Sequence, residues 1–256
     1  MPKLIILGTA AAVADAKHEN THLAFANEKR LLLIDCPGNP VARMQQVGYD
    51  LTHRLTDLLL THFHPDHVSG YPLLLQTLWL LGRTEPLHIY GLDFTLHQAR
   101  RLFNLYDWET WTDFFPLVYH NIPEQEMFMA LDADDIRLYT SPASHYLPTL
   151  AARVELLSGE YAVAYSCDTR PCAAVIRLAE GANILIHEAT GAHTGHSSAA
   201  QAGEVAQQAE AKSLFLIHYP VWKNDPTLLL DEARAEYNGE VSLAQDYQVV
   251  DIEATK

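Results

Sequence analysis

A cluster of three histidines and one aspartate, at residues 61–67, constrains this chain more than any other feature of its sequence. The seven residues are Thr-His-Phe-His-Pro-Asp-His, and they follow the short apolar run Asp57–Leu60, which is typical of a buried strand. A strand that ends at Thr61 releases three imidazoles and a carboxylate into a tight loop, and zinc and similar divalent metals bind these groups. The sequence therefore predicts a metal site at a strand end, in preference to a histidine-rich surface loop or a single structural zinc.

The spacing within this loop predicts two metal ions. His62 and His64 lie two residues apart, so on extended backbone their side chains point the same way and can bind one ion. Asp66 and His67 lie beyond a proline, are turned aside, and can bind a second ion. Two ions about 3.5–4 Å apart hold both the attacking and the leaving oxygen of a hydrolysis reaction. The spacing therefore favours a dinuclear hydrolase.

The pattern His62-x-His64-x-Asp66-His67 resembles the signature of the metallo-β-lactamase fold hydrolases. The resemblance implies an α+β fold, a four-layer αββα sandwich that forms a single domain over residues 1–256, with the metals at one edge. The pattern of the whole chain agrees, because runs of strands with helices interspersed in both halves favour two packed sheets with helices outside.

Apolar runs bounded by turn residues predict the individual elements. The expected strands are 4–7, 21–26, 31–35, 57–60, 87–90, 135–140, 149–156, 161–166, 183–187, 213–217 and 247–252. The expected helices are 39–47, 71–81, a segment around 96–103, 171–178, 198–208 and a last one after Pro226. Residues 104–123 are rich in aromatic side chains and are expected to form a packed corner, a lid or a subunit contact.

Three residues farther along the chain are candidates for the remaining metal ligands. Asp168 and His218 lie at the ends of apolar runs, and His145 lies in a loop between two expected strands. Each has an ordinary alternative, a surface histidine or an aspartate in a local turn. The resemblance implies one ion held by His62, His64, His145 and Asp168 and another held by Asp66, His67, Asp168 and His218, with Asp168 bridging. Zinc is the favoured metal, and manganese and iron also suit these ligands.

The stretch His-Glu-Ala-Thr at 187–190, followed by Gly-His-Ser-Ser at 195–198, holds further candidates for catalysis. Ser198 and Gln201 form a capping box, so His196 is expected just before a helix N-terminus, where backbone N–H groups favour an anion. A protonated His196 can donate to a leaving oxygen as a general acid, and a solvated histidine in a polar loop is the alternative.

These stretches, together with Leu-Ile-His at 216–218, resemble the ribonuclease Z branch of the same hydrolases. In that branch Glu188 and His196 match residues linked to catalysis, with Glu188 supporting the histidine. The chain lacks one feature of the branch, because ribonuclease Z commonly has a long arm that grips transfer RNA between the positions of His145 and Asp168. Here only 22 residues separate them.

The charge balance also separates this chain from proteins that grip nucleic acid. Its net charge is −15, with 32 acidic and 17 basic residues, and it has no clustered basic footprint. The sequence therefore predicts a small anionic substrate and disfavours a nucleic acid.

The leading hypothesis is a dinuclear metal-dependent phosphodiesterase of the ribonuclease Z-like branch, acting on a small phosphodiester. A metal-bound hydroxide, oriented by Asp66, is expected to attack phosphorus while His196 protonates the departing oxygen. The same ligands also suit a lactone, thioester or sulfate-ester hydrolase. A transfer-RNA 3′-processing endoribonuclease and a non-catalytic metal-bound scaffold complete the alternatives.

Cysteine usage and hydropathy predict the setting. Cys36, Cys167 and Cys172 have no paired metal spacing and cannot all pair with one another, and no apolar run reaches membrane-spanning length. A cytoplasmic protein is expected, without a membrane partner, and the resemblance implies a homodimer. Cys36 and Cys167 lie at strand ends and are expected to be packing residues, and Cys167 also lies beside an expected ligand, which allows some reactivity. His22 is left open as a site residue, and the histidines expected at the surface or in packing are His18, His53, His88, His97, His120 and His193.

Overall fold

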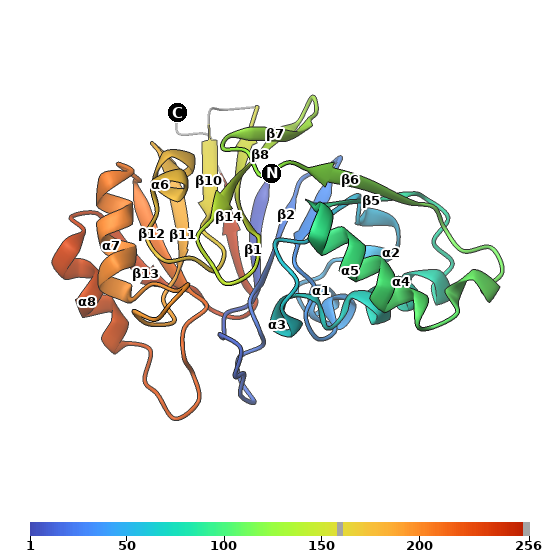
Figure 1. Ribbon diagram of the computed structural model, residues 1–256, viewed down its shortest axis with the longest axis horizontal. Coiled ribbons are helices and arrows are strands. Elements are labelled where there is room, and N and C mark those ends of the chain that lie inside the picture. The colour runs from blue at the N-terminus through green and yellow to red at the C-terminus, as the bar shows by residue number, and fades with distance from the viewer. Residues whose placement is uncertain (158–160, 253–256) are drawn as a thin grey trace.

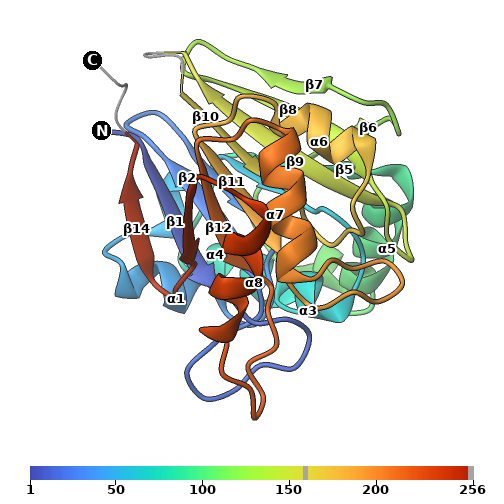
Figure 2. The ribbon, with the colours of Figure 1, turned by 90° about the vertical axis from the view of Figure 1, so that its left-hand side faces the viewer.

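Two seven-stranded sheets pack face to face in the computed structural model, which describes residues 1–157 and 161–252 (Figure 1). Helices cover the outer face of each sheet, so the layers run α, β, β, α (Figures 1 and 2). This arrangement confirms the predicted αββα sandwich.

The first sheet has the order β14-β1-β2-β3-β4-β5-β6. Its strands are β1 (Lys3–Gly8), β2 (His22–Ala26), β3 (Leu31–Ile34), β4 (Asp57–Leu59), β5 (Leu87–Leu92), β6 (Leu117–Ile122) and β14 (Gln248–Asp251). The helices of this half are α1 (Pro40–Gln46), α2 (Leu51–Arg54), the short α3 (Pro65–Val68), α4 (Tyr71–Leu80) and α5 (Asp93–Asn104). Because β14 pairs antiparallel with β1, the last strand of the chain completes the N-terminal sheet.

The second sheet has the order β13-β12-β11-β10-β9-β8-β7. Its strands are β7 (Phe128–Asp132), β8 (Ile136–Ala143), β9 (Thr149–Leu156), β10 (Tyr161–Tyr165), β11 (Ile184–Glu188), β12 (Ser213–Ile217) and β13 (Glu240–Leu243). Its covering helices are α6 (Ala173–Ala179), α7 (Ala199–Gln208) and α8 (Leu228–Glu236). Helix α7 begins with the predicted capping box, in which Ser198 and Gln201 bind each other's backbone N–H groups.

Strand side chains alternate between two cores. In β1, Leu4 and Ile6 enter the core between the sheets, whereas Ile5 and Leu7 face the core beneath the helices. Strands that are covered on both faces have near-continuous apolar sequences, which explains why the central strands were predictable. The strands β6, β7 and β13 were not predicted; each is an edge strand with partly exposed residues.

The parallel parts of both sheets position the functional loops. Strands β3, β4 and β5 run parallel to one another, as do β10, β11 and β12. The carboxyl ends of parallel strands meet at one edge of a sheet, and ligands bind in the crevice beyond those ends. The loops that follow these strands carry most of the candidate metal ligands.

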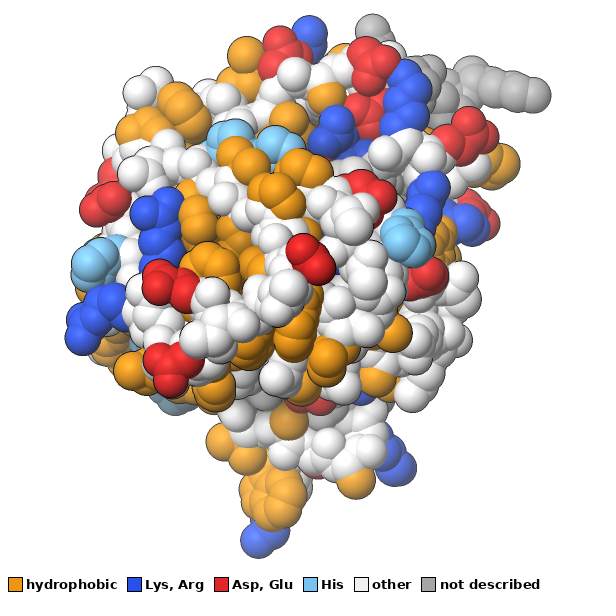
Figure 3. All heavy atoms as spheres, turned by 90° about the vertical axis from the view of Figure 1, so that its right-hand side faces the viewer, with side chains coloured by type: hydrophobic (Ala, Val, Ile, Leu, Met, Phe, Trp, Pro, Cys, Tyr) orange, Lys and Arg blue, Asp and Glu red, His pale blue; other side chains and the backbone are white. Residues whose placement is uncertain are grey.

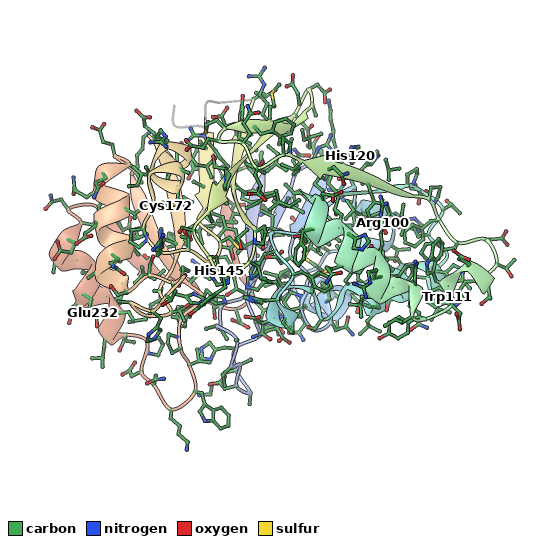
Figure 4. All side chains as sticks on the ribbon, viewed as in Figure 1. Arg100, Trp111, His120, His145, Cys172 and Glu232 are labelled. Atoms are coloured by element: carbon green, nitrogen blue, oxygen red, sulfur yellow. The ribbon has the colours of Figure 1, made fainter. Side chains whose placement is uncertain are left out.

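The aromatic segment does not cover this edge of its own chain. Trp111 stacks on Trp79 of α4 with ring centroids 4.8 Å apart, and Trp108 stacks on Phe103 of α5 at 5.3 Å. In Figure 4, Trp111 lies at one end of the molecule, far from His145 near its centre. The segment is a packed corner of the first half, and a lid over its own metal cluster is ruled out by this position.

Buried His22 on β2 sets an acid limit on stability. Its Nδ1–H donates to the carbonyl oxygen of Asn20, and among the described residues its Nε2 has no hydrogen-bond partner. Burial lowers the pKa of His22 to about 3. Because this folded pKa lies below the unfolded value of about 6.5, unfolding takes up a proton, and stability is lost as the pH falls from 6.5 toward 3.

We expect the protonation of His22 on unfolding to make the free energy of unfolding about 2 kcal/mol lower at pH 5 than at pH 7. Urea unfolding at the two pH values measures the loss, and His22→Gln is expected to lack this part of it. The exposed His97 provides the matched control, His97→Gln, which is expected to keep the pH dependence of the unchanged chain. Equal pH dependence of His22→Gln and the unchanged chain would contradict the expectation.

Candidate metal centre

The structure brings all seven predicted ligand residues together at the edge between the sheets. They come from the loop after β4, the β8–β9 loop, and the segments that follow β10 and β12. One group that can hold an ion consists of His62, His64, His145 and Asp168, and a second consists of Asp66, His67 and His218. His145 lies near the middle of the molecule (Figure 4).

The first group is compact. The Nε2 atoms of His62 and His145 lie 3.0 and 3.2 Å from the Nδ1 atom of His64. Each of these Nε2 atoms also lies 3.8 Å from Oδ2 of Asp168. Ligand bonds of 2.0–2.2 Å in a tetrahedron place neighbouring ligand atoms roughly 3.4 Å apart, so these separations fit a small divalent ion.

The second group shares Asp168 with the first. Oδ1 of Asp168 lies 3.5 Å from Nε2 of His67 and 3.5 Å from Nε2 of His218. Oδ2 of Asp66 lies 3.7 Å from Nε2 of His67 and 3.4 Å from Nε2 of His218. The two oxygens of Asp168 therefore face different groups, which is the geometry of a bridging carboxylate.

Hydrogen bonds fix which nitrogen of His67, His145 and His218 faces the cluster, whereas His64 presents its Nδ1 atom. Nδ1–H of His145 donates to the carbonyl of Gly195 at 2.7 Å, and Nδ1–H of His67 donates to Asp35 at 2.7 Å. The Thr190 hydroxyl donates to the carbonyl of His218, so its oxygen accepts from Nδ1–H of the same residue at 2.8 Å. In the neutral form of these imidazoles, each Nε2 therefore presents a lone pair to the cluster, as metal-binding histidines require.

Asp35 holds the histidine loop in place from the end of β3. Besides His67, it accepts hydrogen bonds from the backbone N–H and the hydroxyl of Thr61, at 2.9 and 2.7 Å. The Thr61 hydroxyl in turn accepts from Nδ1–H of His62 at 3.2 Å. One buried carboxylate thus orients two of the imidazoles. Asp35 and His218 both adopt left-handed backbone, with φ of 60° and 50°, a conformation that is strained for residues other than glycine.

The charges of the cluster fit a metal ion. Nε2 of His67 and Oδ1 of Asp168 are buried, and neither has a hydrogen-bond partner among the described residues. Burial lowers the pKa of His62 well below its ordinary value, which keeps this imidazole neutral. Burial opposes ionisation of Asp66, but His218 and His67 shift its pKa well below the ordinary value, so the carboxylate is ionised. Converging lone pairs beside ionised carboxylates leave a position for a cation.

Glu188 and His196 form a pair at the edge of this cluster, where His196 also lies close enough to Asp168 and His218 to share an ion with them. Nδ1–H of His196 donates to Oε1 of Glu188 at 2.8 Å, and Glu188 also accepts from the backbone N–H groups of Thr169 and Thr190. Burial lowers the pKa of His196, but the hydrogen bond and charge of Glu188 outweigh it and raise the pKa overall. His196 is therefore oriented and holds its proton well.

A cavity of about 700 Å³ opens over the cluster. The side chains that line it nearest the cluster are His64, Asp66, Asp168, His196 and His218. Its walls come from residues 11–13 of the β1–β2 loop and from the loop after β12, with Tyr146, Thr190 and His193 between them.

One expectation about a single residue needs correction, and another needs an addition. His193 is exposed, as expected, and it also lines the cavity, which nothing in its local sequence indicates. Cys167 was expected to have some reactivity; its thiol is fully buried, and burial raises its pKa well above the ordinary value. Trp222 and Tyr146 also line the cavity and were not proposed as site residues.

The chain is similar to proteins of known family. A protein-family model described as "Anti-Pycsar protein Apyc1" matches residues 2–236. The ribonuclease Z of Myxococcus xanthus is 30% identical, with 98% of this chain and 97% of the relative covered. That alignment runs over 307 positions, more than the 256 residues of this chain, so the relative has residues without a counterpart here.

Solved structures show the same fold. The metallo-β-lactamase fold protein YhfI from Bacillus subtilis superimposes with a TM-score of 0.81 at 25% identity, covering 97% of this chain and 98% of YhfI. The short form of human tRNase Z superimposes with a TM-score of 0.79 at 23% identity, covering 98% of this chain and 99% of that structure.

Proposed function

The chain belongs to the family of the anti-Pycsar protein Apyc1 and to the ribonuclease Z family of the metallo-β-lactamase fold, and on this premise we propose that it hydrolyses a small phosphodiester with two divalent metal ions. A metal-dependent hydrolase that acts on phosphodiester bonds is what these relatives indicate. The observation that carries the finer proposal is the convergence of imidazole Nε2 atoms on Asp168, with His196 held beside them.

Two ions are supported by the two ligand groups that share Asp168. Zinc is the metal we propose, because it combines imidazole and carboxylate ligands in small tetrahedral shells; manganese and iron accept the same ligands. When bound, such ions polarise the phosphoryl oxygens and lower the pKa of water at the site.

Side chains of the chain itself have three roles: holding the ions, orienting the imidazoles and donating a proton. Asp66 and Asp168 would supply the negative charge that holds the ions, and Asp35 and Thr190 fix the imidazoles of His67 and His218. We propose that His196, oriented by Glu188, donates its proton to the departing oxygen, because its pKa is raised and it faces the same cavity.

The cavity supports a small substrate. No lysine or arginine is among the described residues that line it, and the chain has a net charge of −15. A transfer RNA presents many phosphates and needs a basic surface to hold them. The relatives named ribonuclease Z favour transfer-RNA processing as the second candidate, but the 30% identical relative has residues that this chain lacks.

The cellular location and the oligomeric state are proposed on fewer observations. Within the described residues, no helix has the length and apolar character needed to cross a bilayer. The cysteines are free, with Cys36 and Cys167 buried, which supports a reducing cytoplasm. A homodimer is supported by the exposed Leu73, Leu80 and Leu81 at α4 and by the apolar area on that side of the molecule (Figure 3). Light scattering of the purified protein measures its mass.

A substrate panel tests the function. The metal-loaded protein is expected to hydrolyse bis(p-nitrophenyl) phosphate and to leave a lactone, a thioester, p-nitrophenyl sulfate and a precursor transfer RNA intact. Elemental analysis of the purified protein is expected to find two metal ions per chain. Cleavage of the transfer RNA would establish the second candidate, whereas turnover of a lactone, thioester or sulfate alone would reject phosphodiester hydrolysis. A loaded protein that acts on none of them would be a non-catalytic scaffold.

A further inference from the structure

We propose that Val13 and Trp222 form an apolar clamp that binds a planar, uncharged group of the substrate, so that the enzyme selects phosphodiesters with such a group. This inference rests on the proposed function of the cavity and adds a specificity determinant to it. The name apolar clamp is used below for these two side chains.

The clamp stands on two loops that are joined to each other. The β1–β2 loop and the loop after β12 project side by side beyond the sheets, in blue and orange in Figures 1 and 2. The backbone N–H of Ala11 donates to the carbonyl of Tyr219 at 3.1 Å, and the N–H of Tyr219 donates to the carbonyl of Thr9 at 3.3 Å. Because Tyr219 directly follows His218, both loops are fixed relative to the metal cluster.

The exposure of the clamp is unusual for side chains of its kind. Trp222 is 56% exposed and Val13 is 60% exposed, and both line the cavity. Their neighbours in the wall are also apolar: Ala11, Ala12, Pro220 and Val221. Apolar side chains gathered at the mouth of a cavity are typical of a binding site, and an indole ring offers a flat face for stacking.

The charges of the cavity determine what this wall accepts. The acidic Asp66 and Asp168 lie in the lining by the cluster, and the described lining residues that can be cationic are histidines. His64 and His218 belong to the candidate metal cluster and His196 is bound to Glu188, so the exposed His193 is the remaining imidazole of the described lining. A second phosphate against Val13 and Trp222 would lose its hydration without gaining a lysine or arginine partner. The group that contacts the clamp is therefore uncharged.

Local hydrogen bonds hold in place the backbone of the loop that carries Trp222. The side-chain amide of Asn224 donates to the carbonyl of Trp222 at 3.0 Å, and the buried hydroxyl of Tyr219 donates to the carbonyl of Ala244 at 2.7 Å. A loop whose backbone is already ordered loses little conformational entropy when it binds substrate. Less of the stacking free energy is then offset, and the substrate binds more tightly. The loops thus serve as a preformed recognition surface.

Two substrates with one leaving group isolate the clamp. Bis(p-nitrophenyl) phosphate and methyl p-nitrophenyl phosphate both release p-nitrophenolate, and they differ in whether the group that stays behind is aromatic or methyl. The measured quantity is the ratio of kcat/KM for the aromatic substrate to kcat/KM for the methyl substrate. Trp222→Ala is expected to lower this ratio about tenfold, since one aromatic stacking contact is worth about that factor.

Matched variants keep the test specific. Trp222→Phe retains a planar ring and is expected to keep the ratio within about twofold, because the ring supplies the stacking surface. Tyr106, which is 54% exposed and lies in the aromatic corner away from the cavity, provides the control Tyr106→Ala, which is expected to have the ratio of the unchanged chain. An active Trp222→Ala enzyme with an unaltered ratio would overturn the clamp. If the unchanged, metal-loaded chain hydrolyses neither substrate, the proposed function is rejected instead.

Discussion

Replacing Asp66 with alanine is expected to lower kcat/KM for bis(p-nitrophenyl) phosphate by about 10³-fold or more, because several kcal/mol of charge stabilisation at the metal site are lost. Asp66 is the carboxylate that the second ligand group does not share with the first, at 3.7 Å from His67 and 3.4 Å from His218. Its removal leaves that group with two imidazoles and the bridging Asp168. Elemental analysis is expected to show less than two metal ions per chain, while steady-state kinetics gives the loss of activity.

The fold is expected to survive this substitution. Asp66 lies in the short α3, its side chain is 13% exposed, and it takes no part in the apolar cores. Circular dichroism of the metal-free variant is therefore expected to match that of the metal-free unchanged chain. Asp231→Ala, at an aspartate that is 88% exposed on α8, is the matched control and is expected to retain full activity. An Asp66→Ala protein with unimpaired turnover would refute the proposed metal chemistry.

The second large effect is expected at His196, where the loss depends on the leaving group. If His196 protonates the departing oxygen, its removal harms a substrate that releases a poor leaving group and spares one that releases a stable anion. His196→Ala is expected to lower kcat/KM about 10²- to 10⁴-fold for methyl phenyl phosphate, and far less for methyl p-nitrophenyl phosphate. Both substrates have the same group that stays on phosphorus, a methoxy group, so the contacts of that group with the cavity wall stay constant.

Glu188 offers a graded version of the same test. Glu188→Gln keeps a hydrogen-bond acceptor at 2.8 Å from Nδ1 of His196 but removes the charge that raises its pKa. A smaller loss with the same dependence on the leaving group is expected, since the histidine is still oriented. Equal losses for both substrates in His196→Ala would show that His196 binds substrate rather than protonating the leaving group.

The fold could be predicted, and six of the seven candidate ligands could be picked out, because the strands that precede them are largely buried; His145 instead follows β8, which is partly exposed. Strands β4, β10 and β12 are short and nearly all apolar, and a histidine or aspartate close behind such a run stands out. The candidate ligands lie as close together as the predicted grouping into two sets requires, with Asp168 between them, and the grouping itself stays a prediction. That grouping was predicted from the family resemblance, whereas the residue spacing alone predicted only that the histidine loop binds metal.

The edge strands were harder to predict for a physical reason. Strands β6, β7 and β13 each pair on one side only, and their partly exposed residues do not form an apolar run. The residues Leu117–Ile122 lie within the aromatic segment, whose composition hid the strand.

The cavity wall was beyond sequence reasoning because it is made by loops that meet only in the folded chain. His193 and Trp222 carry no motif; the loop of Trp222 is positioned by the pairing of Tyr219 with the β1–β2 loop, and His193 is positioned by bonds within the β11–α7 loop. The left-handed backbone at Asp35 and His218 is equally invisible in the sequence, since neither residue is a glycine. Such strain is tolerated where surrounding contacts over-determine the conformation.

Asp168, which follows a strand of the second sheet, faces His62 and His67 of the first sheet, so the candidate ligand groups span both sheets. His62, His64 and His67 stand on the first sheet, while His145, Asp168 and His218 stand on the second. A cation that binds ligands from both sheets binds the folded chain and not the unfolded one, so it stabilises the folded state. At a free ion concentration 100-fold above the dissociation constant, the free energy of unfolding rises by about 2.7 kcal/mol. Metal supply in the cell thus becomes a determinant of how long this protein lasts, as well as of how fast it works.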